Sequence, residues 1–253
     1  MNAVNAVNPV TSGPRRVVVT GGTRGVGRAT SLALAAAGAR VLAVYRSDDD
    51  AAAALASEPG WDADRCRSVC LNLTTAPGRA ALAAAVADHL GGVDLLVNNL
   101  AAYRPAPLSR CSESEVADGL YANLTVHLLV TRSLLDLLAD GGAVVNVGAG
   151  MADRGRAGHV VFTAAKAGLA GFTRALAKEL APRSIRVNTV APGVVETERG
   201  LDLPPPVRSE LLAAIPLRRF VTAADVANAV LFLGDGRLSG RISGTNVRVD
   251  GGL

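Results

Sequence analysis

The sequence predicts a single doubly wound α/β domain with a seven-stranded parallel sheet and helices on both faces. Short apolar segments alternate with helical segments of about 10–15 residues, which is typical of βαβ units and of a parallel sheet. A glycine-rich turn directly follows the first apolar segment, Val17–Val19. No linker or break in composition divides the chain, so one domain is expected over residues 14–253.

Local signals place the elements in chain order. Pro77 fits the first turn of a helix because it has no N–H group to leave unpaired. The segments Ser112-x-x-Glu115 and Thr222-x-x-Asp225 have the spacing of a capping box, which predicts a helix start at each. The expected strands cover 17–19, 40–45, 65–73, 93–98, 143–147, 184–190 and 245–249. The expected helices cover 28–37, 48–58, 77–90, a long 112–139, 158–180 and a last one from 222, with a proline-rich segment at about 193–220 where a lid over a site would lie.

Composition and charge exclude several classes of function. The net charge is +4, but the basic residues are dispersed, which argues against nucleic-acid binding. No window approaches about 18–20 unbroken apolar residues, so no membrane span is expected. Residues 1–13 carry no positively charged segment and are expected to be a disordered lead rather than a signal peptide. Three cysteines, Cys66, Cys70 and Cys111, have no metal-binding or redox spacing and suit a reducing cytoplasm.

The glycine-rich turn has the pattern of a cradle for a pyrophosphate. Gly21, Gly25 and Gly27 let the backbone turn tightly, approach a ligand and pack the helix on the strand. The helix that follows offers free N–H groups and the positive end of its dipole. A tight strand–helix turn that binds nothing is the alternative.

The residues after the second strand indicate which dinucleotide the cradle prefers. Folds that bind NAD usually have an acidic residue there, whereas a basic residue accommodates a 2′-phosphate. This chain has Arg46 and Ser47 at that corner, with Arg24 in the glycine turn nearby. The pattern favours NADP(H); the alternative is that Arg46 is a solvated loop residue.

On these motifs the chain resembles the short-chain dehydrogenase/reductase family, in the form typified by ketoacyl-carrier-protein reductases. Thr20, Gly21, Gly25 and Gly27 meet its TGxxxGxG motif in full, and residues 98–101 (Asn-Asn-Leu-Ala) match half of its Asn-Asn-Ala-Gly. A Pro-Gly turn with a later threonine, a helix asparagine and a carboxyl-terminal Val-Asp-Gly-Gly also match, at Pro192, Gly193, Thr197, Asn123 and 249–252.

The resemblance implies a Rossmann-type fold, NADP(H) as cofactor and a small-molecule substrate. It also implies a homo-oligomer, either a dimer or a tetramer. Asn72 stands where the family usually has an aspartate beside the adenine, and it can still accept a hydrogen bond. The cofactor site implied in this way consists of Gly21, Thr23, Arg24, Gly25, Val26, Gly27, Arg46, Ser47, Asn72, Asn99, Lys166, Pro192, Gly193, Val195 and Thr197.

The catalytic residues of the family are matched only in part. The family has a serine after strand five and, thirteen residues later, Tyr-x-x-x-Lys; the positions here are Ala149, Phe162 and Lys166, with the spacing intact. Loss of one donor to a developing oxyanion typically costs about 10²–10³ in rate, so ordinary carbonyl reduction is not expected. Lys166 would keep the task of binding the nicotinamide ribose. Only Lys166 and Lys178 among the 26 basic residues are lysine, which is consistent with a particular role for Lys166.

Other side chains are candidates for the missing proton donor. His159 lies three residues before Phe162, Tyr103 lies in the loop after strand four, and His127 lies one turn after Asn123. Each could donate a proton, although each could equally be a loop or packing residue. Ser109 and Thr163 are weaker candidates.

The sequence is compatible with three functions. One is an NADP(H)-dependent reductase of an already electrophilic molecule, such as an enone, an iminium or a quinone-like ring. Another is an enzyme that catalyses a non-redox step, such as cyclisation or dehydration, on the same scaffold. The third is a catalytically silent subunit that stabilises an active homologue in a hetero-oligomer.

Overall fold

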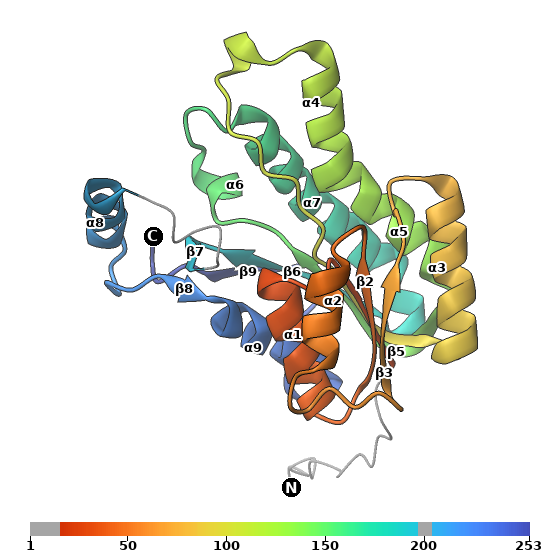
Figure 1. Cartoon of the computed structure of the whole chain (residues 1–253). Coiled ribbons are helices and arrows are strands. Elements are labelled where there is room, and N and C mark those ends of the chain that lie inside the picture. Colours follow the sequence, from red (N-terminus) through yellow and green to blue (C-terminus); the bar gives the residue numbers. More distant parts are fainter. Residues whose placement is uncertain (1–15, 197–203) are drawn as a thin grey trace, which may run out of the picture.

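Seven parallel strands form one sheet in the order β3-β2-β1-β4-β5-β6-β9 (Figure 1). The computed structural model describes residues 16–196 and 204–253, so the predicted lead at 1–13 and Thr197 lie outside the described residues. The sheet confirms the predicted fold class. The strands of this sheet are β1 (Arg16–Thr20), β2 (Arg40–Tyr45), β3 (Cys66–Cys70), β4 (Val93–Asn98), β5 (Leu138–Val147), β6 (Arg186–Pro192) and β9 (Asn246–Val249).

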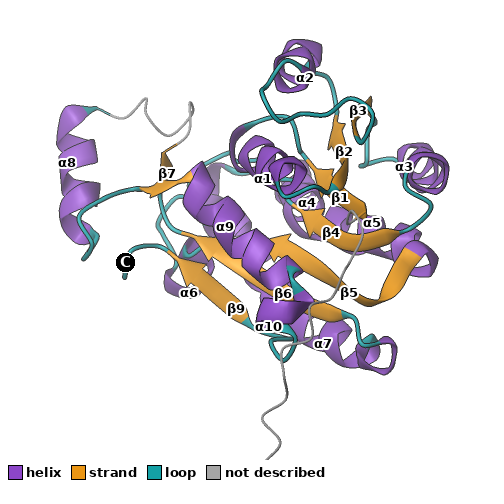
Figure 2. Ribbon diagram, turned by 90° about the horizontal axis from the view of Figure 1, so that it is seen from below, coloured by secondary structure: helices purple, strands orange, loops and turns teal. Residues whose placement is uncertain are grey.

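Helices cover both faces of the sheet (Figure 2). Successive side chains of β1 point to opposite faces, so Val17 and Val19 pack under α1 and α9, whereas Val18 packs under α3, α5 and α7. All three valines are fully buried, which is the reason for a continuous apolar run in a central parallel strand. The covering helices are α1 (Gly25–Ala36), α3 (Ala76–His89), α5 (Val126–Leu134), α7 (Val160–Glu179) and α9 (Ala223–Gly234), and the shorter helices are α2 (Asp49–Ala56), α4 (Glu113–Leu120), α6 (Met151–Arg154), α8 (Pro205–Ala214) and α10 (Gly236–Ser239).

The strand order reverses between β1 and β4. The chain runs from β1 outward to β2 and β3 and then returns to add β4 on the other side of β1. Loops that follow neighbouring strands therefore diverge at this point, which leaves a crevice at the carboxyl ends of the strands. The sites described below lie along this edge.

The prediction of one long helix over 112–139 is wrong for its C-terminal part. Both capping boxes are present as predicted, and Ser112 and Glu115 begin α4. A π-helical turn, Tyr121–Thr125, then separates α4 from α5, and strand β5 already begins at Leu138. Leu138 pairs with Val93 of β4, so strand pairing overrides the helical pattern there.

The proline-rich segment at 193–220 contains structure that the sequence did not predict. β7 (Val195–Glu196) pairs with β8 (Val221–Thr222) outside the main sheet, and α8 lies between them in the chain. Figure 1 places α8 at the end of the molecule beside this pair. Prolines at its start cost α8 no hydrogen bond, because first-turn N–H groups have no partner in the helix.

Helix α7 is the one helix in the described part of the chain that is long and apolar enough to cross a membrane. It packs against β6 and α4, and Ala165, Leu169 and Leu176 are buried. A core helix of a packed domain has the same composition, so we attribute its apolar character to this position.

Candidate functional site

The glycine turn after β1 is closely packed and tolerates no added side chain at its centre. Gly21 and Gly25 have φ angles of 62° and 49°, in the left-handed region that favours glycine. A Cβ atom on Gly27 would lie 1.9 Å from the Gly21 carbonyl oxygen and 2.6 Å from Asn99 Nδ2. Asn99 Nδ2 donates to the Thr20 and Gly21 carbonyl oxygens at 3.2 and 3.1 Å. The predicted glycines and Asn99 therefore form one unit that ties the turn to the end of β4.

The start of α1 is open to an anion. Its N-cap residue, Arg24, makes no side-chain capping bond, and the first turn contains no acidic residue. The first N–H groups of the helix are therefore unsatisfied by the helix itself. Thr23 is buried at the turn, and Val26 lines a larger cavity described below. This geometry fits a pyrophosphate.

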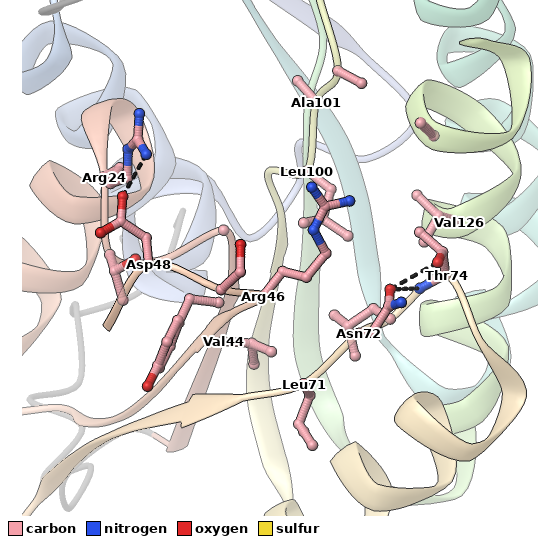
Figure 3. A pocket seen from close by; sticks show the side chains of 17 residues that line it. Arg24, Val44, Arg46, Asp48, Leu71, Asn72, Thr74, Leu100, Ala101 and Val126 are labelled. Carbon is pink, nitrogen blue, oxygen red and sulfur yellow. Dashed lines mark hydrogen bonds and ion pairs between the residues drawn. The ribbon is translucent and has the colours of Figure 1, made fainter. Parts of the chain in front are cut away.

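Beside this turn lies a cavity of about 270 Å³ (Figure 3). Arg24 forms an ion pair with Asp48 at 2.5 Å. Arg46 has neither an ion pair nor a hydrogen-bond partner for its guanidinium among the residues described, and it extends across the cavity toward Leu100. Of the two arginines predicted to bind a 2′-phosphate, Arg46 is therefore available, whereas Arg24 is already paired. Ser47 is exposed and lines the same cavity.

Asn72 lines the far wall of this cavity, as its predicted place beside an adenine requires. Its Oδ1 atom accepts hydrogen bonds from the Thr74 backbone N–H at 3.2 Å and from the Thr74 hydroxyl at 2.7 Å (Figure 3). The side chain thus stabilises its own turn. Both lone pairs of Oδ1 are thus engaged, so any contact with a ligand falls to the amide nitrogen.

Lys166 is buried, with 3% of its surface exposed. Its Nζ donates to the Val147 carbonyl oxygen at 2.9 Å and to the Leu100 carbonyl oxygen at 3.4 Å. Burial away from water lowers the pKa of Lys166 to about 7. Its charge is therefore held by two backbone carbonyl groups, and no carboxylate among the described residues forms an ion pair with it.

Tyr103, His159 and Phe162 meet in one cluster. The Tyr103 ring stands edge-on to the Phe162 ring, with 5.2 Å between centroids, and its hydroxyl is hydrogen-bonded to His159 Nε2. His159 Nδ1 lies 2.8 Å from the Ala157 carbonyl oxygen, which can only accept. We therefore assign the proton to Nδ1, so that Nε2 accepts from Tyr103. Burial raises the pKa of the Tyr103 hydroxyl, with the charge of Arg156 acting in the opposite direction.

A cavity of about 700 Å³ brings the predicted catalytic positions together. Ala149, Phe162 and Lys166 line it with Tyr103. Pro192, Gly193 and Val195 of the predicted cofactor set line it as well, and so does Asn99. The Phe162 ring centroid is 6.0 Å from Lys166 Nζ. A reacting group in this cavity would meet a hydroxyl from Tyr103 but none from position 149 or 162.

Asn123 lies outside this cavity, in the π-helical turn. Its Oδ1 accepts from the Ala102 N–H at 3.0 Å, and its Nδ2 donates to the carbonyl oxygens of Ala102 and Gly119 at 2.8 and 2.9 Å. All hydrogen-bonding groups of its amide are thus engaged by the backbone. Because Ala102 precedes Tyr103, the Asn123 amide holds the loop that carries Tyr103, and its catalytic role stays a prediction.

His127 is fully buried on the same helical segment. Neither ring nitrogen makes a hydrogen bond of ordinary geometry within the described residues. Burial, together with the charge of Lys166, lowers its pKa well below the ordinary value, and the Leu100 carbonyl acts in the opposite direction. His127 is therefore neutral and does not line the cavity beside Tyr103.

Sequence reasoning missed three charged residues of the cavity. Arg154 reaches it from the end of α6, Arg156 from the segment that follows, and Glu210 from α8. The helix α8 was not predicted, so no signal pointed to Glu210. The Arg-Gly-Arg triplet just before the helix predicted from 158 could have indicated that Arg154 and Arg156 lie near the site.

The chain is similar to reductases along almost its whole length. It matches the family described as enoyl-(acyl carrier protein) reductase over residues 21–253. A 3-oxoacyl-[acyl-carrier-protein] reductase of Vibrio cholerae is 35% identical over 238 residues, which are 93% of this chain and 96% of that protein. Carbonyl reductase family member 4 of Danio rerio is 37% identical over 240 residues, 94% of this chain and 98% of that protein.

Solved structures agree with this similarity. A doubly substituted short-chain dehydrogenase/reductase of Serratia marcescens superposes with a TM-score of 0.89 at 27% identity, covering 95% of this chain and 98% of that one. A blue fluorescent protein from a metagenomic library, solved in complex with NADPH, superposes with a TM-score of 0.88 at 30% identity and the same coverage.

Proposed function

This chain belongs to the short-chain dehydrogenase/reductase family, and from that premise we propose that it is an NADP(H)-dependent reductase with a non-standard active site. Its substrate in this proposal is an already electrophilic small molecule, such as an enone, an iminium or a quinone-like ring. The observation that carries the proposal is that Tyr103, hydrogen-bonded to His159, stands against Phe162 in the wall of the cavity that Lys166 also lines.

The residues present fit NADP(H). The open start of α1 would hold the pyrophosphate, and the unpaired guanidinium of Arg46 would hold the 2′-phosphate. Lys166 would exchange its bonds to backbone carbonyls for the hydroxyls of the nicotinamide ribose. The solved relative in complex with NADPH supports this assignment. When bound, NADPH supplies the hydride.

Counted by the spacing of the motif, Ala149 and Phe162 stand where the family has its serine and its tyrosine. Neither side chain has a hydrogen-bond donor, so an unactivated ketone would meet no group from these positions that stabilises the developing oxyanion. A conjugated or cationic acceptor is already electron-poor, so hydride transfer to it needs less help from an acid. This is the reason for the substrate class in the proposal.

Tyr103 would supply the proton that accompanies the hydride. Its raised pKa keeps the hydroxyl protonated at neutral pH, so it can donate to the α-carbon of an enone, to the oxygen of a quinone or to the nitrogen of a neutral imine, whereas an iminium already carries its proton. His159 Nε2 accepts the hydrogen bond of the Tyr103 hydroxyl and holds it in place. Phe162 fixes the Tyr103 ring edge-on, and Asn123 fixes the preceding residue, Ala102. The ring contact and the loop thus hold Tyr103 in the wall of the cavity, with its hydroxyl hydrogen-bonded to His159.

NADPH oxidation with a panel of cyclohexenone, 1-pyrroline and 2-methyl-1,4-naphthoquinone tests the proposal. Tyr103→Phe should lower kcat by about 10²–10⁴ and leave the Kd of NADPH unchanged, because it removes a general acid and no cofactor contact. Tyr121→Phe is the matched control, since its hydroxyl donates to the Thr74 carbonyl outside the cavity. Failure of NADPH to bind at millimolar concentration, or equal kcat for Tyr103→Phe and the wild type, would contradict the proposal.

The same acid–base pair supports a second candidate, a non-redox proton transfer such as cyclisation or dehydration. Tyr103 and His159 could move a proton in an apolar cavity without consuming NADPH. Product formation without NADPH oxidation would favour this candidate. Co-purification with a homologue that has the serine and tyrosine, and no turnover alone, would instead favour a silent subunit.

We also infer a cytoplasmic homo-oligomer. Cys66, Cys70 and Cys111 are free thiols, which suits a reducing compartment. Light scattering coupled to size-exclusion chromatography measures the assembly, and a monomer at micromolar concentration would contradict it.

A further inference from the structure

Two exposed arginines, Arg154 and Arg156, line the large cavity, and much of its wall is apolar. Ala149, Met151, Phe162 and Leu211 are among the apolar residues that line it. Arg154 ends α6, and Arg156 follows after a single glycine, Gly155, whose φ of 72° turns the chain between them. Both arginines line the cavity and both are exposed.

Arg156 lies close enough to Tyr103 to affect its hydroxyl. Burial raises the pKa of Tyr103, and the positive charge of Arg156 partly opposes this effect. The backbone of Arg156 is anchored, because its carbonyl oxygen accepts from the His159 N–H at 3.1 Å. A group bound by Arg156 would therefore lie beside the Tyr103–His159 pair.

Neither guanidinium is paired with a carboxylate of the residues that the structure describes. Within the described residues, Arg154 and Arg156 form no ion pair and no side-chain hydrogen bond. Asp250, which approaches Gly150 from the same side as Arg154, is engaged by Arg248 at 2.5 Å. Glu210 lines the cavity from α8 and makes no ion pair with either arginine.

We propose that the substrate carries an anionic group, such as a carboxylate, which Arg156 and Arg154 bind at the mouth of the cavity. The electrophilic part of the substrate then lies against Phe162, within reach of Tyr103. Arginine suits this task because its planar guanidinium binds an oxyanion through two parallel hydrogen bonds. The inference rests on the proposed reductase function and adds the substrate class to it.

A matched pair of quinones tests the inference. The neutral probe is 2-methyl-1,4-naphthoquinone and the anionic probe is 1,4-naphthoquinone-2-sulfonate, which has a similar ring. Their Kd values on the NADP⁺ complex are measured by calorimetry, so that no turnover is needed. NADPH oxidation with the neutral probe is measured separately and reports on the reductase function alone.

The wild type should bind the sulfonate more tightly than the neutral quinone. Arg156→Gln should weaken sulfonate binding at least about tenfold, and the double variant with Arg154→Gln more, because charge-assisted hydrogen bonds are lost. Binding of the neutral quinone should change less than about twofold, since no apolar wall is altered. Arg241→Gln is the control. This exposed arginine precedes β9 and so lies near the amino ends of the strands, whereas the cavity lies at their carboxyl ends.

Two results would overturn the inference. One is equal loss of affinity for both quinones in Arg156→Gln, which would assign Arg156 to the shape of the pocket. The other is unchanged sulfonate affinity in Arg156→Gln. Together with an equal loss of thermal stability in Arg156→Gln and Glu210→Gln, it would show that Arg156 holds α8 in place and does not bind the anionic group. Absence of NADPH oxidation with otherwise intact sulfonate selectivity would reject the reductase function and keep the anion site.

Discussion

Gly27→Ala tests whether the closely packed turn is needed for both folding and cofactor binding. The new Cβ would lie 1.9 Å from the Gly21 carbonyl oxygen. Real Cβ atoms essentially never approach another atom within 3.0 Å, so the turn would have to move by about 1 Å. That oxygen also accepts from Asn99 at 3.1 Å, and the movement would break this hydrogen bond.

The expected magnitude combines three terms. Overpacking costs about 1–3 kcal/mol, and the lost hydrogen bond costs about 1 kcal/mol. The better helix propensity of alanine offsets about 1 kcal/mol of this. The net loss of stability is about 1–3 kcal/mol, which lowers Tm by about 2–12 °C in a domain of this size.

The control is the same substitution at Gly171, in the middle of α7. A Cβ there meets no atom within 4 Å, so only helix propensity changes. Gly171→Ala should therefore raise Tm by about 2–4 °C. Circular dichroism gives Tm for both variants, and NADPH fluorescence gives Kd.

NADPH binding should weaken at least about tenfold in Gly27→Ala and stay unchanged in Gly171→Ala, because only the first variant moves the amides that face the pyrophosphate. Equal Tm and equal Kd for Gly27→Ala and the wild type would refute the reasoning, since the turn would then have room that the structure does not show.

Three further predictions concern the cavity and its surroundings. The double variant Ala149→Ser/Phe162→Tyr should gain at least about 10² in kcat for a simple ketone, because it restores two donors; no gain would show that the substrate cannot reach them. Lys166 is charged only below about pH 7, so the Kd of NADPH should rise as pH increases through 7, and Lys166→Met should remove that part of the pH dependence, measured by fluorescence titration. His127→Leu should stabilise the protein by about 1 kcal/mol, since it removes buried nitrogens that make no hydrogen bond. Because the folded state keeps His127 neutral while the unfolded chain takes up a proton below about pH 6.5, the wild type should lose stability as pH falls through that value, and the variant should lose less in chemical denaturation.

The glycine turn and the helix starts could be predicted because their causes are local. Gly21 and Gly25 adopt positive φ angles, which other residues rarely adopt, and a capping box satisfies backbone groups within one turn. The valines of β1 likewise indicate a strand buried on both faces. Such requirements act over a few residues and can be recognised in any sequence that contains them.

Contacts between residues that are far apart in the sequence could not be predicted in the same way. Leu138 continues a helical pattern, yet it joins β5 because Val93 of β4 offers it a partner. Arg24 and Arg46 look equivalent in the sequence, but Asp48 pairs with Arg24 and leaves Arg46 available. Each outcome depends on which group the fold places next to the residue.

The sequence by itself determined the fold class, the cofactor turn and the identity of the residues at positions 149 and 162. Only the tertiary structure decided that Tyr103, from the loop after β4, would meet His159 and Phe162 at the start of α7. It also decided that the Asn123 amide would bind the backbone of Ala102, beside Tyr103. The physical reason is that backbone preferences are encoded within a few residues, whereas the meeting of side chains 56 positions apart depends on strand order and helix packing.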